Sequence, residues 1–170
     1  EIPRCAGDRL QAGGPGSIAL QLATSSLDVL MGGGRSDFGN GAGSPIETSA
    51  GAGFSLLQTR ADLSGATLGT RWLGLFADGN FAPRMLGEDG RVAERIGPAG
   101  ELPAPFACVP NPAADAQPAL ADMTRRAVEK LERAPGGFFL IVESALIDKA
   151  SHVRNPCGSI GGVRQLDETV

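Results

Sequence analysis

The stretch PALADMTRRAVEKLERAPGGFFLIVES, residues 118–144, decides the fold class. Its first part predicts an amphipathic helix over residues 118–133, because apolar side chains recur there at intervals of three and four: Leu120, Met123, Ala127 and Leu131. Pro118 suits the first turn of such a helix, where a missing N–H costs nothing, and the turn residues 135–137 end it. The apolar run at residues 138–142 then predicts a strand buried on both faces, as in a parallel sheet.

Upstream of this stretch, further short strands and helices are predicted. Ser17 is placed to cap a short helix over residues 18–23. Apolar runs that end at turn residues predict three short strands, at residues 28–31, 54–57 and 73–77. This alternation of short strands with helices indicates an α/β protein whose strands pair in parallel.

The remaining segments are interpreted as connections. Residues 35–53 are rich in Gly, Ser and Ala, which favours a loop with one helical turn, and the proline-rich residues 81–117 are expected to run over the surface. Neither internal repeats nor a composition shift divides the chain. We therefore expect a single domain over residues 1–170.

Composition and charge argue against two classes of partner. The 170 residues carry a formal net charge of −4 without a Lys/Arg-rich run, which argues against a nucleic-acid-binding surface and a polybasic membrane anchor. No apolar run approaches the roughly 20 residues that span a bilayer. The first residue is Glu1 and no signal-peptide pattern follows it, so we expect a processed N-terminus or a piece of a longer chain.

The three cysteines, Cys5, Cys108 and Cys157, form no C-x-x-C pair, so a zinc ribbon or a thioredoxin-type site is not expected. Cys108 and Cys157 lie close to prolines in loop-like sequence, a setting that suits a disulfide of an exported protein. A single bridge leaves an odd cysteine, whose partner would then be missing from this chain.

The residues that could carry chemistry follow the apolar run at residues 138–142. Glu143 ends the predicted strand, and in parallel α/β sheets ligands bind beyond the carboxyl ends of strands. Asp148 and His152 are spaced i,i+4, so on a helix their Cβ atoms would lie roughly 5–6 Å apart and could share a zinc ion. Glu143, an oxygen ligand, would suit a neighbouring magnesium.

A plainer interpretation of the same residues is available. Asp148 could pair with Lys149 or cap a turn, His152 could be a surface histidine, and Glu143 could be the polar end of a strand. The pattern D-x-x-x-H is short, and catalytic zinc takes three protein ligands, whereas His152 is the only histidine. The residues alone therefore indicate at most a half-built zinc site.

The segment GFFLIVESALIDKASHVRNPCGSIGGVRQLDETV, residues 137–170, closely resembles alkaline phosphatases of the bacterial periplasmic branch. The similarity continues in PALADMTRRAVEKLERAPGGFFL, in ACVPNP around Cys108, in LGLFADGN at 73–80, in DVLMGGG at 28–34 and in CAGDRLQAGGPGSIALQL near the N-terminus. The blocks occur in the family's order and leave only about residues 35–72 and 88–104 poorly matched. The resemblance implies the central portion of a three-layer α/β/α fold with a mostly parallel sheet.

The resemblance also implies roles for individual residues. Glu143 falls on a magnesium ligand, and Asp148 and His152 fall on two ligands of the first zinc. Lys149 falls on a lysine that holds the substrate phosphate through water. Cys108 and Cys157 fall on a disulfide pair, and the partner of Cys5 lies upstream of this chain.

Several departures from the family pattern accompany the resemblance. Ser144 stands where the family has Gly after the magnesium glutamate, and Ser151 stands where it has Asp before the zinc histidine. The family's nucleophilic serine lies in an Asp-Ser-Ala segment, which this sequence lacks. Ser144 aligns with the glutamate block and is not taken as a nucleophile, so no catalytic residue is identified. The phosphate-clamping arginine precedes Glu1 in the family order, and the remaining zinc ligands also lie outside these residues.

The implied function is hydrolysis of phosphate monoesters by a zinc- and magnesium-dependent alkaline phosphatase through a phosphoserine intermediate. This chain would be an incomplete, inactive piece that supplies part of the metal site. The intact protein is expected to be a periplasmic or secreted homodimer, with neither nucleic acid nor membrane as partner. The alternatives are a non-catalytic binding or structural protein on the same scaffold, and a superfamily relative such as a sulfatase or phosphomutase.

Overall fold

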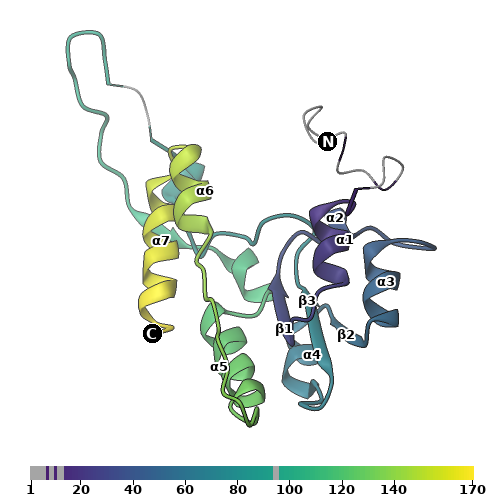
Figure 1. Ribbon diagram of the computed structural model, residues 1–170. Helices are drawn as coiled ribbons and strands as arrows, with labels where there is room; N and C mark the ends of the chain where they lie inside the picture. Colours follow the sequence, from purple (N-terminus) through teal and green to yellow (C-terminus); the bar gives the residue numbers. More distant parts are fainter. Residues whose placement is uncertain (1–6, 8–9, 11–13, 94–95) are drawn as a thin grey trace. The chain divides into compact units, whose positions relative to one another are not determined.

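The computed structural model describes residues 7, 10, 14–93 and 96–170 (Figure 1). Cys5 lies outside the described residues. The chain divides into two compact units, Glu1–Gly79 and Asn80–Val170, each of which is considered by itself. Across the described part of the chain, none of the helices combines the length and hydrophobicity that crossing a bilayer requires.

A three-stranded parallel sheet forms the centre of the first unit (Figure 1). Its strands are β1 (Val29–Gly32), β2 (Phe54–Leu57) and β3 (Arg71–Leu75), in the order β1-β3-β2. All three predicted strands and their parallel pairing are confirmed, with the bounds of β1 and β3 shifted by one or two residues. Trp72 and Leu73 are completely buried because β3 lies in the middle and successive side chains point to opposite faces.

Over residues 14–79, four short α-helices accompany this sheet. The predicted helix α1 (Ile18–Ala23) is confirmed, and the Ser17 hydroxyl accepts a hydrogen bond from the backbone N–H of Leu20 at 3.2 Å. Ala19 and Ala23 of α1 share a hydrophobic core with residues of α2, β2 and β3: Phe38, Phe54, Leu73 and Leu75. The other helices are α2 (Arg35–Phe38), α3 (Pro45–Gly51) and α4 (Arg60–Gly65).

The interpretation of residues 35–53 as loop with a single helical turn is wrong, because α2 and α3 both form there. The cause is local capping. The Ser44 hydroxyl accepts from the backbone N–H of Glu47 at 3.2 Å, and Pro45 occupies the first turn of α3. The Ser44 cap and Pro45 therefore favour a helix here, although the Gly and Ser content of the segment is typical of a loop.

The described part of the second unit contains two antiparallel strands, two helices of 12 residues and one of 7 residues. Strands β4 (Met85–Gly87) and β5 (Cys108–Pro110) pair antiparallel. The helices are α5 (Leu120–Leu131), α6 (Leu146–His152) and α7 (Pro156–Asp167), and two single 3-10 turns are η3 (Glu88–Gly90) and η4 (Pro112–Ala116). The predicted buried face of α5 is confirmed at all four positions: Leu120, Met123, Ala127 and Leu131. A disulfide joins Cys108 to Cys157, with the Cα atoms 5.3 Å apart.

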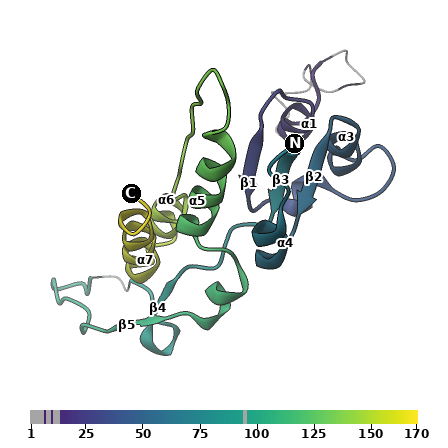
Figure 2. The same cartoon turned by 90° about the horizontal axis from the view of Figure 1, so that it is seen from below.

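The predicted buried strand at residues 138–142 is wrong, because this segment forms neither strand nor helix and is largely exposed. The chain turns after α5 and runs back beside it (Figures 1 and 2). Phe139 is 86% exposed and Ile141 76%. A strand needs a neighbour for its backbone N–H and C=O groups, and none of the described strands pairs with this segment.

Arg71 connects the loops around the sheet of the first unit. Its guanidinium donates hydrogen bonds to the carbonyls of Leu27 and Ala52, both at 2.8 Å, and to that of Ser25. It also stacks 4.0 Å above the centre of the Phe54 ring. A lysine has neither the planar fork nor enough donors in the right directions to replace these contacts.

We therefore predict that Arg71→Lys lowers the free energy of unfolding by about 2–3 kcal/mol, since hydrogen bonds from a charged group contribute about 1.5–3 kcal/mol each. Urea denaturation followed by circular dichroism measures the change. Arg133→Lys, at an exposed position, is the control and should change the unfolding midpoint little. Equal effects of the two substitutions would show that the Arg71 contacts do not hold the loops.

The exposed apolar segment at residues 138–142 should promote self-association, because unpaired strand-like segments pair with other chains. Replacing both Phe139 and Ile141 with Lys should weaken self-association at least tenfold, since each side chain removes more than 1.4 kcal/mol of apolar burial. Sedimentation velocity over a concentration series measures it. The control is Leu102→Lys, which replaces another exposed apolar side chain. If this control acts as strongly, the segment has no special role.

Candidate metal centre

Helix α6 carries the predicted zinc ligands, and its two ends are fixed by backbone hydrogen bonds. The first turn forms as Ile147 N–H donates to the Ser144 carbonyl at 3.1 Å. At the other end Arg154 is left-handed, with φ of 54°, and Asn155 N–H donates back to the Ala150 carbonyl at 2.8 Å. This arrangement is a Schellman motif, which ends a helix within one residue. The predicted helical placement of Asp148 and His152 is thereby realised in the last two turns.

The structure brings Asp148 and His152 together on one face of α6. Nε2 of His152 lies 3.4 Å from Oδ1 of Asp148. Both side chains face solvent, with 69% of the Asp148 side chain and 76% of the His152 side chain exposed. The pair is therefore open to an ion and to a ligand of that ion.

This separation fits zinc. Zinc binds carboxylate oxygen and imidazole nitrogen at about 2.0–2.2 Å, so two ligands of a tetrahedral ion lie roughly 3.3–3.5 Å apart. The observed 3.4 Å is within that range. A carboxylate and an imidazole are also a donor set that zinc prefers. The pair could hold zinc without a change of helix geometry.

The other two predicted site residues lie next to this pair in sequence. Glu143 is exposed and precedes α6, and Lys149 is exposed on α6 beside Asp148. Within residues 14–93 and 96–170 no three His, Cys, Asp or Glu side chains lie close enough together to hold one metal ion. The described residues therefore bring one carboxylate and one imidazole together, at Asp148 and His152, and place the Glu143 carboxylate separately before α6.

Helix α6 packs along helix α7 (Figures 1 and 2). Asn155 caps the start of α7, and the Asn155 side-chain oxygen accepts from Gly158 N–H at 2.9 Å. A Cβ at Gly158 would lie 2.9 Å from the Ala150 Cβ, and a Cβ at Gly162 would lie 2.9 Å from Cγ1 of Ile147. Both glycines thus allow an approach of the two helices that a side chain would block.

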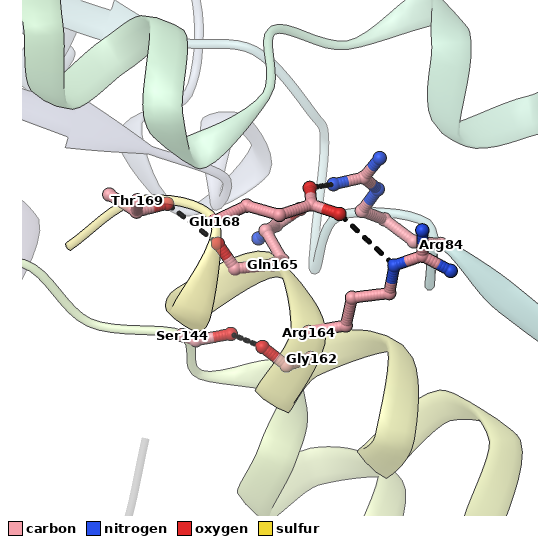
Figure 3. Close-up of polar contacts among 7 residues, drawn as sticks. All are labelled: Arg84, Ser144, Gly162, Arg164, Gln165, Glu168 and Thr169. Atoms are coloured by element: carbon pink, nitrogen blue, oxygen red, sulfur yellow. Dashed lines mark hydrogen bonds and ion pairs between the residues drawn. The ribbon is translucent and has the colours of Figure 1, made fainter.

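Hydroxyl groups reinforce this contact. The Ser144 hydroxyl donates to the Gly162 carbonyl at 2.8 Å, and Ser144 is only 8% exposed (Figure 3). The Ser151 and Ser159 hydroxyls lie 3.0 Å apart, and that of Ser151 donates to the Ile147 carbonyl at 2.7 Å. Sequence reasoning missed these supports, although the spacing of Gly158, Gly161 and Gly162 was the available signal for a closely packed helix.

An ion-pair cluster fixes the far end of α7 (Figure 3). Arg84, just before β4, donates to one carboxylate oxygen of Glu168, and Nε of Arg164 donates to the other at 3.1 Å. The hydrogen bond from Arg84, together with that from Arg164, lowers the pKa of Glu168 below its usual value. The cluster ties the end of α7 to the β4–β5 strands of the same unit.

The parallel sheet of the first unit and the helices beside it define a class, that of α/β proteins, and the second unit adds an exposed carboxylate–imidazole pair. Within that class, the alkaline phosphatase family model matches residues 3–170. The chain therefore belongs to the alkaline phosphatase family, as the sequence blocks predicted. This family is metal-dependent.

A curated relative and a solved structure agree with this assignment, and a second solved structure of lower identity shares the fold. Alkaline phosphatase of Escherichia coli (strain K12) is 41% identical over 178 residues, which cover 98% of this chain and 37% of the relative. The crystal structure of Thermus thermophilus alkaline phosphatase aligns with a TM-score of 0.64 and 26% identity over 89% of this chain and 28% of that one. TAB5 alkaline phosphatase, solved as a mutant with magnesium bound, aligns with a TM-score of 0.62 and 20% identity over 89% and 37%. The chain thus spans about 37% of the length of its curated relative.

The lowered pKa of Glu168 predicts a pH-dependent contribution to stability. A carboxylate whose folded pKa lies below its unfolded value, about 4.3, stabilises the fold above that value and loses the contribution as pH falls through the folded pKa. Because the pair is partly exposed, we expect Glu168→Gln to cost about 0.5–1 kcal/mol at pH 7.

Urea denaturation at pH 7 and at pH 3 checks this, and the difference between Glu168→Gln and the parent should shrink at pH 3. Asp167→Asn removes a neighbouring exposed carboxylate on the same helix and serves as the matched control. A cost for Glu168→Gln that does not depend on pH would contradict the ionic origin of the contribution.

Proposed function

We propose that this chain supplies part of the metal site of an enzyme that hydrolyses phosphate monoesters through a phosphoserine intermediate. The observation that carries the proposal is the 3.4 Å separation of the Asp148 and His152 ligand atoms on an exposed face of α6, in a member of the alkaline phosphatase family. Family membership favours this function over sulfatase or phosphomutase chemistry.

Each residue has a distinct proposed role. Asp148 and His152 hold zinc, one as an anionic oxygen ligand and the other as a neutral nitrogen ligand. Glu143 is a ligand of magnesium, which prefers carboxylate oxygens and retains several waters. Lys149 orients the substrate phosphate through water, as a point charge beside Asp148. When bound, the metal ions supply charge stabilisation for an in-line displacement at phosphorus.

The nucleophile and the remaining ligands belong to parts of the protein outside these 170 residues. Ser144 does not suit the role, because its hydroxyl is buried and donates to the Gly162 carbonyl. Exposed serines near α6, such as Ser151, are likewise engaged with backbone carbonyls. We therefore assign neither Ser144 nor Ser151 as the nucleophile, and the proposed contribution of the chain is to binding and orientation.

The setting of the whole protein is proposed on the same basis. The disulfide between Cys108 and Cys157 supports export to the periplasm or secretion, since such bonds persist in oxidising compartments. The family match runs through both compact units, which supports one domain over residues 1–170 as the central portion of the family fold. Homodimerisation of the intact protein is part of the proposal.

Zinc binding by the 170-residue chain tests the proposed ligands. Because His152 is the only histidine, its ring signals in NMR spectra need no further assignment. Adding Zn²⁺ should shift them, and isothermal titration should give one weak site per chain. Asp148→Asn should weaken binding at least about tenfold, the loss that removing even an outer-sphere partner can cause.

Asp167→Asn is the control for loss of a carboxylate and should leave zinc binding unchanged. With zinc and magnesium present at alkaline pH, the chain should not hydrolyse p-nitrophenyl phosphate above the level of an Asp148→Ala variant. Turnover that disappears in this variant would mean that the chain holds its own nucleophile, and the proposed division of roles would then be wrong.

A further inference from the structure

Ser144 sits at the junction between Glu143 and α6, and it is tied down at two points. Its hydroxyl donates to the Gly162 carbonyl of α7 at 2.8 Å, and its own carbonyl accepts from Ile147 N–H at 3.1 Å. Only Ser49 and Ser144 are buried polar residues in the described part of the chain. A buried hydroxyl is costly without a hydrogen bond, so the bond to α7 fixes where this residue can lie.

The bond requires the close approach of the two helices. A Cβ at Gly162 would lie 3.0 Å from the Ile147 nitrogen and 2.9 Å from its Cγ1, so a larger residue there would push the start of α6 away. The Gly162 carbonyl lies inside α7, where a helical carbonyl accepts one backbone N–H and retains a second lone pair. The Ser144 hydroxyl uses this second site without breaking α7.

Glu143 is bonded directly to Ser144, so the bond between Ser144 and α7 also restrains the backbone of Glu143. Without a hydroxyl at position 144, this residue would lose its bond to α7 and keep the bond that its own carbonyl accepts from Ile147 N–H. With the hydroxyl, the Cα of Ser144 is held relative to both helices. The Glu143 side chain therefore extends from a backbone position that is fixed relative to α6, the helix that carries Asp148 and His152.

We propose that Ser144 is a positioning residue that fixes Glu143 relative to the Asp148–His152 pair by fastening the start of α6 to α7. This inference rests on the proposed metal-binding function of these three residues. Ser144 is not one of the proposed metal ligands. Through its bond to α7 it sets the distance between the two proposed metal positions.

The test uses the 170-residue chain loaded with Co²⁺ or, as a diamagnetic reference, Zn²⁺. The pseudocontact shift of the Glu143 backbone amide reports its position relative to the ion at Asp148 and His152. Ser144→Ala and Ser144→Gly should reduce this shift at least twofold by motional averaging, and should leave the shift of the Ala150 amide within α6 unchanged. Ser144→Thr, which keeps a hydroxyl, should restore the parent value.

Ser159→Ala is the matched control, because it removes the other hydroxyl contact between α6 and α7, at 3.0 Å from Ser151, and leaves the Glu143 junction intact. It should not change the Glu143 shift. An unchanged shift in Ser144→Ala, or an equal reduction in Ser159→Ala, would overturn the positioning role while the metal site stands. If Ser144→Ala does not fold, failure of Ser144→Thr to keep the parent shift would overturn it as well. Absence of Co²⁺ binding by the parent chain would overturn the proposed function, and this inference with it.

Discussion

The second unit depends on the direct contact between the backbones of α6 and α7. Gly158 and Gly162 place no side chain between the helices, so Ala150 and Ile147 pack against bare backbone. That contact fixes how α6 is rotated about its axis, and the rotation decides which residues face outward. Asp148 and His152 are exposed because the opposite face of α6, including Ala150, is taken up by α7. The exposed carboxylate–imidazole pair thus arises from packing on the opposite face of the helix.

Helix α7 can serve as a support because both of its ends are fastened to the β4–β5 strands. At its start, the disulfide from Cys157 to Cys108 closes a sequence separation of 49 residues, which contributes about 4 kcal/mol in the chain-entropy model. At its end, Glu168 joins Arg84 next to β4. Between these points Gly161 faces the backbone of Met85. The disulfide contributes most of the free energy that holds α7 to the β4–β5 strands, and the partly exposed ion pair contributes little.

Local patterns carried the correct helix predictions, and a missing non-local partner explains the wrong strand, whereas the helices at residues 35–53 were missed because their local capping signals were outweighed by Gly and Ser content. The buried face of α5 and the helical spacing of Asp148 and His152 follow from the 3.6-residue period, which needs no knowledge of the rest of the chain. The strand expected at residues 138–142 needs a neighbouring strand, and apolar sequence alone cannot supply one. Gly162 is similar, because only the packed structure shows that Ile147 lies against it.

The two positions near the proposed metal ligands that depart from the family pattern share a physical consequence. Ser144 and Ser151 stand where the resemblance places Gly and Asp, and both hydroxyls are used at the contact between α6 and α7. Ser151 removes a negative charge beside His152, which lessens the electrostatic attraction for a cation. In exchange, its hydroxyl reaches Ser159 and the Ile147 carbonyl. Each departure therefore adds a hydroxyl that forms hydrogen bonds within the second unit, and at position 151 this hydroxyl takes the place of a carboxylate next to His152.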